Sequence, residues 1–197
     1  IDAMLPALGV ISSDLKFTNI NDGQLIITAV FIGMSFGLLL FGPLSDSYGR
    51  KKAIYLGIGI FLVGTLISMF SSNLNTMIVG RLLQGFGTSS CRVGTISMIR
   101  DKFVGREMGR IVSLIMIFFI LVPVVAPSVG QAILMISDWR TIFGFMGALG
   151  LFGLVWMQLR QPETLLLEKR LKFELSTIMS GAVETIKNTH ATGYTIA

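Results

Sequence analysis

Long apolar runs separated by short polar segments make up most of the chain. The complete runs hold about 18 or more residues, and a helix of that length can cross a hydrocarbon core of about 30 Å. Apolar and polar residues do not alternate along these runs as they would in barrel strands, and backbone groups in lipid must be satisfied internally. The pattern predicts an all-α integral membrane protein with spans at residues 1–13 (incomplete), 24–41, 53–70, 76–99, 111–136 and 141–159.

Composition supports the membrane assignment. Hydrophobic residues form 52% of the chain and charged residues only 14%, against roughly 25% charged in soluble domains. The net charge of +5 does not indicate nucleic acid binding, because the basic residues form short clusters between apolar runs rather than a stripe with interleaved aromatic residues.

The lysines and arginines lie mainly on one side of the predicted spans. By the positive-inside rule this side is cytoplasmic, and we expect the chain before residue 1 to start there too. The connections on the other side hold only Lys16 and Arg140, while Arg81 and Arg92 lie within the fourth span. The cytoplasmic set comprises Arg50, Lys51, Lys52, Arg100, Lys102, Arg106, Arg110, Arg160, Lys169, Arg170, Lys172 and Lys187.

The two ends of the chain suggest a fragment of a longer protein. The chain starts without Met inside an apolar run, and residues 191–197 read as the start of a seventh span. Pro162 disfavours helix at the residue before it and ends the sixth span. We expect residues 1–159 to form the bundle and 160–190 a linker, which either lies along the membrane surface or is a solvated tether.

The segment 42–52, GPLSDSYGRKK, is too short and too patterned to be an ordinary loop. Gly42 and Gly49 permit tight turns, and Asp46 can cap a helix N-terminus. Arg50 can pair with a carboxylate on a neighbouring helix end, and Asp101 is the best candidate on the same side. The alternative, a plain topology signal, does not need this spacing.

Small residues recur at helix-packing spacing in two spans. Gly33 and Gly37 are four residues apart, and glycines recur every third residue in 144–153. Such positions let helices approach closely and predict a tight bundle.

The fourth span carries a polar face. At 100° per residue, Gln84, Thr88 and Arg92 fall within about 60° of Arg81, and Thr95 continues the stripe. An arginine within lipid is costly and is expected to face a cavity or a partner. We expect this face to line a transport path, although Arg92 could instead extend to the cytoplasmic edge.

Asp2 lies deep in the first span. If that helix ends near residue 13, Asp2 is roughly 17 Å from its outer end, close to the depth of Gln84. A carboxylate at this depth is a candidate functional group. The alternative is a structural pair with Arg81 or with a tyrosine.

The fifth span contains two prolines four residues apart, Pro123 and Pro127. Each removes a helix hydrogen bond, so the helix should bend, and a bent helix can act as a gate.

Residues for enzyme chemistry are scarce. One cysteine, Cys91, and one histidine, His190, form neither an internal disulfide nor a metal site. We therefore expect no enzyme activity, cofactor or metal.

Four motifs resemble the major facilitator superfamily. The 42–52 segment is similar to that family's loop between its second and third helices, and GRLLQGFG at 80–87 is similar to the R-x-x-Q-G-x-G motif of its proton-coupled drug exporters. The DAMLPAL segment at 2–8 resembles the bicyclomycin and chloramphenicol resistance subfamily. The exporters' G-P-x-x-G-G motif is matched only in part, because Ala126 and Gln131 replace two of its glycines while Pro127 and Gly130 fit.

The resemblance implies the N-terminal half of a twelve-helix fold with a central cavity, monomeric in a bacterial inner membrane. It implies a proton-coupled antiporter that exports amphipathic small molecules, or alternatively a transporter of one sugar or organic ion. Its partners would be substrate, protons, lipid and the second half of the chain. The implied roles are transport and proton coupling for Asp2, Arg81, Gln84, Thr88 and Arg92, a conformational latch for Gly42, Asp46, Gly49, Arg50, Lys51 and Asp101, and a gate for Pro123, Pro127 and Gly130.

Overall fold

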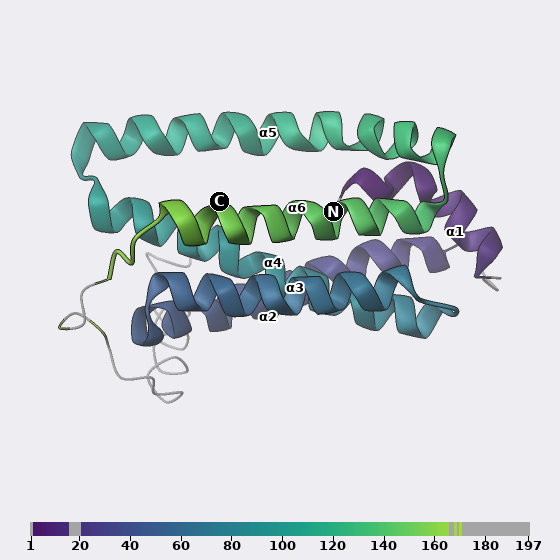
Figure 1. The fold of residues 1–197 in the computed structure, drawn as a ribbon, viewed down its shortest axis with the longest axis horizontal. Helices are drawn as coiled ribbons and strands as arrows, with labels where there is room; N and C mark the ends of the chain where they lie inside the picture. Colours follow the sequence, from purple (N-terminus) through teal and green to yellow (C-terminus); the bar gives the residue numbers. More distant parts are fainter. Residues whose placement is uncertain (1, 16–20, 166–167, 169, 171–197) are drawn as a thin grey trace, which may run out of the picture.

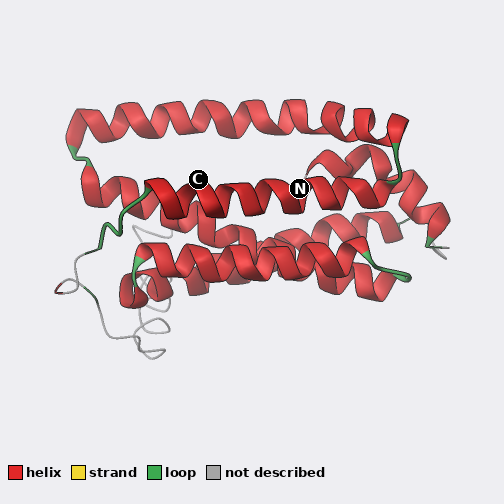
Figure 2. Ribbon diagram, in the orientation of Figure 1, coloured by secondary structure: helices red, strands yellow, loops and turns green. Residues whose placement is uncertain are grey.

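The computed structural model describes residues 2–15, 21–165, 168 and 170. Within these residues the chain is helical and contains no strand (Figure 2). The predicted seventh span at 191–197, His190 and most of the predicted linker lie outside them. The elements are η1 (Asp2–Ala7), α1 (Leu8–Asp14), α2 (Asp22–Tyr48), α3 (Arg50–Met69), α4 (Leu74–Lys102), α5 (Gly105–Ile136) and α6 (Trp139–Arg160).

The long helices run side by side along the bundle (Figure 1). Helix α4 packs most extensively, against both α2 and α3, while α3 also contacts α6. Helix α5 lies along one edge and makes its main contact with η1. Two ends can be distinguished: the "basic end", where the α2–α3 and α4–α5 turns and the C-terminus of α6 lie, and the "Asp14 end", where α1 ends and α6 begins.

Glycines allow α4 to approach its two main neighbours closely. A Cβ atom on Gly33 would fall inside contact distance of the Leu82 carbonyl oxygen, and one on Gly85 would strike the Val30 carbonyl oxygen. On the α3 side, a Cβ on Gly87 would meet the Gly57 carbonyl oxygen. The predicted close packing at Gly33 and Gly37 is therefore present, and it places α4 at the centre of the bundle.

Four helices, α2, α3, α5 and α6, are long and apolar enough to cross a membrane, among the residues described. Helix α4 has 29 residues, enough length to span, but its polar residues lower its hydropathy. The first predicted span is a 3-10 turn followed by a short α-helix. Pro6 lies inside that 3-10 segment and lacks the N–H that a regular helix would use.

The predicted loop at 42–52 is mostly helix, and here the sequence-based prediction was wrong. Helix α2 continues through Gly42 and Pro43 to Tyr48, and α3 begins two residues later at Arg50. Pro43 loses only its own backbone bond, and an apolar helix in lipid keeps its remaining backbone bonds by continuing.

One carboxylate ties three segments together at the Asp14 end. Asp14 accepts hydrogen bonds of 2.9 Å from Trp139 Nε1 and from Arg140 Nη1. Arg140 also donates to the Ser71 carbonyl oxygen at 3.3 Å. The bond from Trp139 and then that from Arg140 hold the pKa of the Asp14 carboxyl below its usual value of 3.8.

Replacing Gly85 with Ala should destabilise the bundle by about 1–3 kcal/mol, because the new Cβ would push α4 away from the Val30 carbonyl. Gly59→Ala is the matched control, since a Cβ on Gly59 meets nothing within 4 Å. Thermal unfolding of the purified protein measures both, and equal melting temperatures would contradict the packing account.

Asp14→Asn should lower the melting temperature above about pH 4, and the difference from the wild-type protein should shrink as the pH falls further. A lowered folded-state pKa means that the carboxylate stabilises the folded protein above its ordinary pKa and loses this effect as the pH falls. Melting curves between pH 3 and pH 7 test this, and a pH-independent difference between the two proteins would refute it.

Candidate functional site

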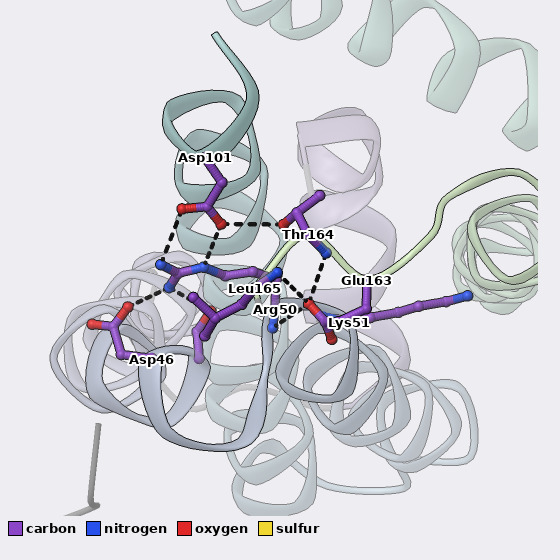
Figure 3. A network of polar contacts seen from close by, with 8 residues as sticks. Asp46, Arg50, Lys51, Asp101, Glu163, Thr164 and Leu165 are labelled. Carbon is purple, nitrogen blue, oxygen red and sulfur yellow. Dashed lines mark hydrogen bonds and ion pairs between the residues drawn. The ribbon is translucent and has the colours of Figure 1, made fainter. Parts of the chain in front are cut away.

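The turn between α2 and α3 forms the first part of the candidate site (Figure 3). Gly49 separates the two helices with φ of 106°, a conformation that favours glycine. Its N–H donates to the Ser45 carbonyl oxygen at 3.2 Å and closes the end of α2. This reversal places Arg50 in the first turn of α3, beside the last turn of α2.

The guanidinium of Arg50 joins three helices. It donates to Asp101 Oδ2 on α4 at 3.0 Å and to Ser45 Oγ on α2 at 3.2 Å, and it forms an ion pair with Asp46. The Arg50 side chain is only 10% exposed, and the Asp101 side chain that it bonds to is 20% exposed, so this charge-assisted bond is partly shielded from water. The structure thus brings Asp46, Arg50 and Asp101 together, as the sequence pattern predicts.

The carboxylate at the N-terminus of α3 is Glu163, not Asp46. The backbone N–H groups of Arg50 and Lys51 donate to Glu163 Oε1 and Oε2, each at 3.1 Å. Asp46 lies in the last turn of α2 and cannot reach these groups, because α2 runs on past it. The predicted cap at Asp46 was therefore wrong, while an anion does occupy the positive end of the helix.

The segment after α6 completes this network. From here on, "the latch" means only the residues that bond to one another in it: Asp46, Arg50, Asp101, Glu163 and Thr164. Thr164 Oγ1 donates to Asp101 Oδ2 at 3.1 Å (Figure 3). Nearby, Lys51 Nζ donates to the Gln158 carbonyl oxygen at 3.2 Å. Glu163 was not among the residues predicted from the sequence, although an acidic residue directly after a helix on the basic side was a usable signal.

A second polar group lies inside the bundle. Arg81 on α4 is fully buried, and its Nη1 donates to Gln84 Oε1 at 2.9 Å. Gln84 Nε2 in turn donates to Thr65 Oγ1 on α3 at 2.7 Å. The guanidinium lies 4.5 Å over the ring of Phe143 on α6, a favourable contact for a desolvated cation. Arg81 Nε has no hydrogen-bond partner in the structure.

Asp2 does not pair with Arg81. It is half-buried in the first turn of η1 and makes no hydrogen bond or ion pair within the described part of the chain. The sulfur of Met4, two residues later, is the η1 atom that meets the Arg81 guanidinium. The structural alternative for Asp2, a pair with Arg81, is therefore not found, and its proton-coupling role stays a prediction.

The polar face of α4 becomes more exposed toward the basic end. Thr88 is half-buried and donates to the Gln84 carbonyl oxygen at 2.8 Å. Arg92 and Thr95 are exposed. Arg92 faces α5, with its guanidinium 5.8 Å from the centre of the Phe119 ring.

Helix α5 continues unbroken through both prolines. Pro123 is exposed and Pro127 half-buried, while Gly130 is buried against η1. A Cβ on Gly130 would strike the Ala3 carbonyl oxygen, so α5 and η1 touch by backbone here. The gate role of these three residues stays a prediction.

No group of three His, Cys, Asp or Glu side chains among the described residues could hold a metal ion. Cys91 is half-buried and forms no disulfide. The chemistry that the described side chains offer is therefore charge pairing, hydrogen bonding and apolar contact.

Comparison with known proteins agrees with this arrangement. The sequence model of the Major Facilitator Superfamily matches residues 2–190. Over the whole chain, the sequence is 35% identical to an uncharacterized MFS-type transporter, YdgK, of Bacillus subtilis and 31% identical to a bicyclomycin resistance protein homolog of Haemophilus influenzae. A chloramphenicol resistance protein of Pseudomonas aeruginosa is 32% identical over 75% of the chain and 35% of its own length.

The chain spans about half the length of the curated relatives that it matches along its whole length, 49% in each case. Among solved structures, the human organic anion transporter MFSD10 (TETRAN) shares the fold with a TM-score of 0.61 and 19% identity, over 84% of this chain and 39% of that one. The chain belongs to the Major Facilitator Superfamily, a family of multi-pass membrane transporters rather than enzymes.

Proposed function

We propose that the protein is a proton-coupled antiporter that exports amphipathic small molecules by alternating access. The observation that carries this proposal is the buried Arg81–Gln84–Thr65 group, which connects the central helix α4 to α3. A charge within a membrane bundle marks a substrate or ion pathway by default. Relatives named for bicyclomycin and chloramphenicol resistance support drug-like substrates.

Asp2 is the proposed proton site. It is a half-buried carboxylate in η1, the same segment whose Met4 contacts Arg81. Protonation there would change the charge beside the polar face of α4 without the need for a direct ion pair. Binding of substrate and of proton can then compete through one region of the bundle.

The latch is proposed to steady one of the two states of alternating access. It connects the ends of α2, α3 and α4 to the segment after α6, so movement of any of these ends must break charge-assisted bonds. We further propose that the basic end faces the cytoplasm of a bacterial inner membrane, and that the protein works as a monomer.

Asp2→Asn should abolish proton-driven efflux in the protein expressed from its complete reading frame, because an amide cannot carry the proton. Efflux from everted vesicles under an imposed pH gradient measures this. Asp138→Asn is the control, since Asp138 is an exposed carboxylate whose side chain does not cap α6. Proton-driven efflux at the wild-type rate in the Asp2→Asn variant would exclude Asp2 from proton coupling. Transport of one sugar or organic ion, and of no drug, would instead favour the alternative of a substrate-specific transporter.

Asp101→Asn should lower the transport rate about tenfold while leaving membrane insertion intact. It weakens the bonds to Arg50 and Thr164 together, and loss of a charged hydrogen bond of about 1.5 kcal/mol shifts a two-state equilibrium by about that factor. Glu107→Gln is a matched control, because Glu107 is an exposed acidic residue at the same end of the bundle. Equal rates in all three proteins would show that the latch does not influence the cycle.

A further inference from the structure

Two arginines of α4 line one pocket against α5. Arg92 and Arg100 lie eight residues apart and border a cavity of about 420 Å³. Neither forms an ion pair with an acidic residue in the described part of the chain, and Arg92 instead lies 5.8 Å from the centre of the Phe119 ring. Two cations in one cavity without an acidic partner there can bind an anion from outside the bundle.

Arg92 meets α5 away from the helix ends. Its Cα lies ten residues before Lys102, about 15 Å from that end of α4, whereas Phe119 lies fourteen residues after Gly105, about 21 Å along α5. Only two residues join these two helices, so both distances are counted from nearly the same level of the bundle. The contact between the Arg92 guanidinium and the Phe119 ring therefore lies between these two levels, because each side chain tilts toward the N-terminus of its own helix.

A guanidinium held at depth by one aromatic face retains unused N–H donors. Arg100 lies nearer the basic end, about 12 Å from Arg92 along the helix axis. The pocket therefore has one cation at its inner end and one at its mouth.

The remaining walls are apolar and adaptable. Ile96 lies between the two arginines on α4. The two methionines of the wall, Met108 and Met116, have unbranched, flexible side chains that accept apolar groups of varied shape. The α5 wall consists of Met108, Val112, Met116 and Phe119.

We propose that the Arg92–Arg100 pocket binds amphipathic organic anions that carry one carboxylate or sulfonate. The anionic group bonds to a guanidinium, whose planar fork suits two oxygens at once. The apolar body lies along the α5 wall. The inference deepens the proposed transport function and rests on it for the role of the site, although binding itself can be measured without transport.

The test is equilibrium binding to the intact protein in phosphatidylcholine nanodiscs. The probe is naphthalene-1-sulfonate, and naphthalene-1-methanol is its neutral counterpart with the same ring system. We expect saturable sulfonate binding that is weakened about tenfold or more in Arg92→Gln and in Arg100→Gln, with weak binding of the alcohol unchanged. Arg92→Lys should weaken sulfonate binding less, because it keeps the charge but loses the fork.

Arg110→Gln is the matched control, since Arg110 is an exposed arginine of α5 outside this pocket. Sulfonate affinity equal to wild type in the folded Arg100→Gln and Arg92→Lys variants would overturn the proposal, even if Arg92→Gln fails to fold. Equal affinity for the sulfonate and the alcohol would also overturn it.

Two further measurements distinguish free organic anions from lipid phosphate, and the anion site from the export function. Complete displacement of the sulfonate by phosphatidylglycerol in the nanodisc would overturn the proposal for free organic anions and assign the pocket to a lipid phosphate. Arginine-dependent sulfonate binding in a protein that exports no drug would support the site while contradicting the proposed export function. Drug export together with sulfonate binding that does not depend on the arginines would support the proposed export function and contradict the proposed anion site.

Discussion

The close approach of α4 to α2 and α3 is the constraint on which the rest of the bundle depends. Backbone meets backbone at Gly33, Gly85 and Gly87, where a single methyl group would not fit. This packing leaves one face of α4 directed at η1, α5 and α6, and that face carries Arg81 and Arg92. A helix with low hydropathy can be central to a membrane protein because its neighbours, rather than lipid, surround it.

The polar face of α4 changes character along its length. Near the middle, Arg81 is buried, donates to Gln84 and lies over the Phe143 ring. Three turns further toward the basic end, Arg92 is exposed and lies near the Phe119 ring. A single helix therefore presents one fully buried arginine and one exposed arginine on its polar face.

The latch shows how a helix end can connect distant parts of the chain. Glu163 accepts from the first N–H groups of α3 across more than one hundred residues of sequence. Thr164 simultaneously reaches Asp101, which is already bonded to Arg50. The segment that leaves α6 is thereby part of the same network as the α2–α3 turn, so the two are expected to move together or to separate only when these bonds break.

The sequence by itself determined the helical class, a chain reversal within residues 42–52, the tight packing at Gly33 and Gly37, and the grouping of Arg50 with Asp101 at one end. These features follow from local spacing and from the need of a backbone in lipid to satisfy its own hydrogen bonds. Only the tertiary structure decided that Glu163 rather than Asp46 caps α3, that Met4 rather than Asp2 meets Arg81, and that Arg92 lies near Phe119 of α5. Which side chains meet across helices depends on where each helix ends and how it is rotated, and spacing along one helix does not contain that information.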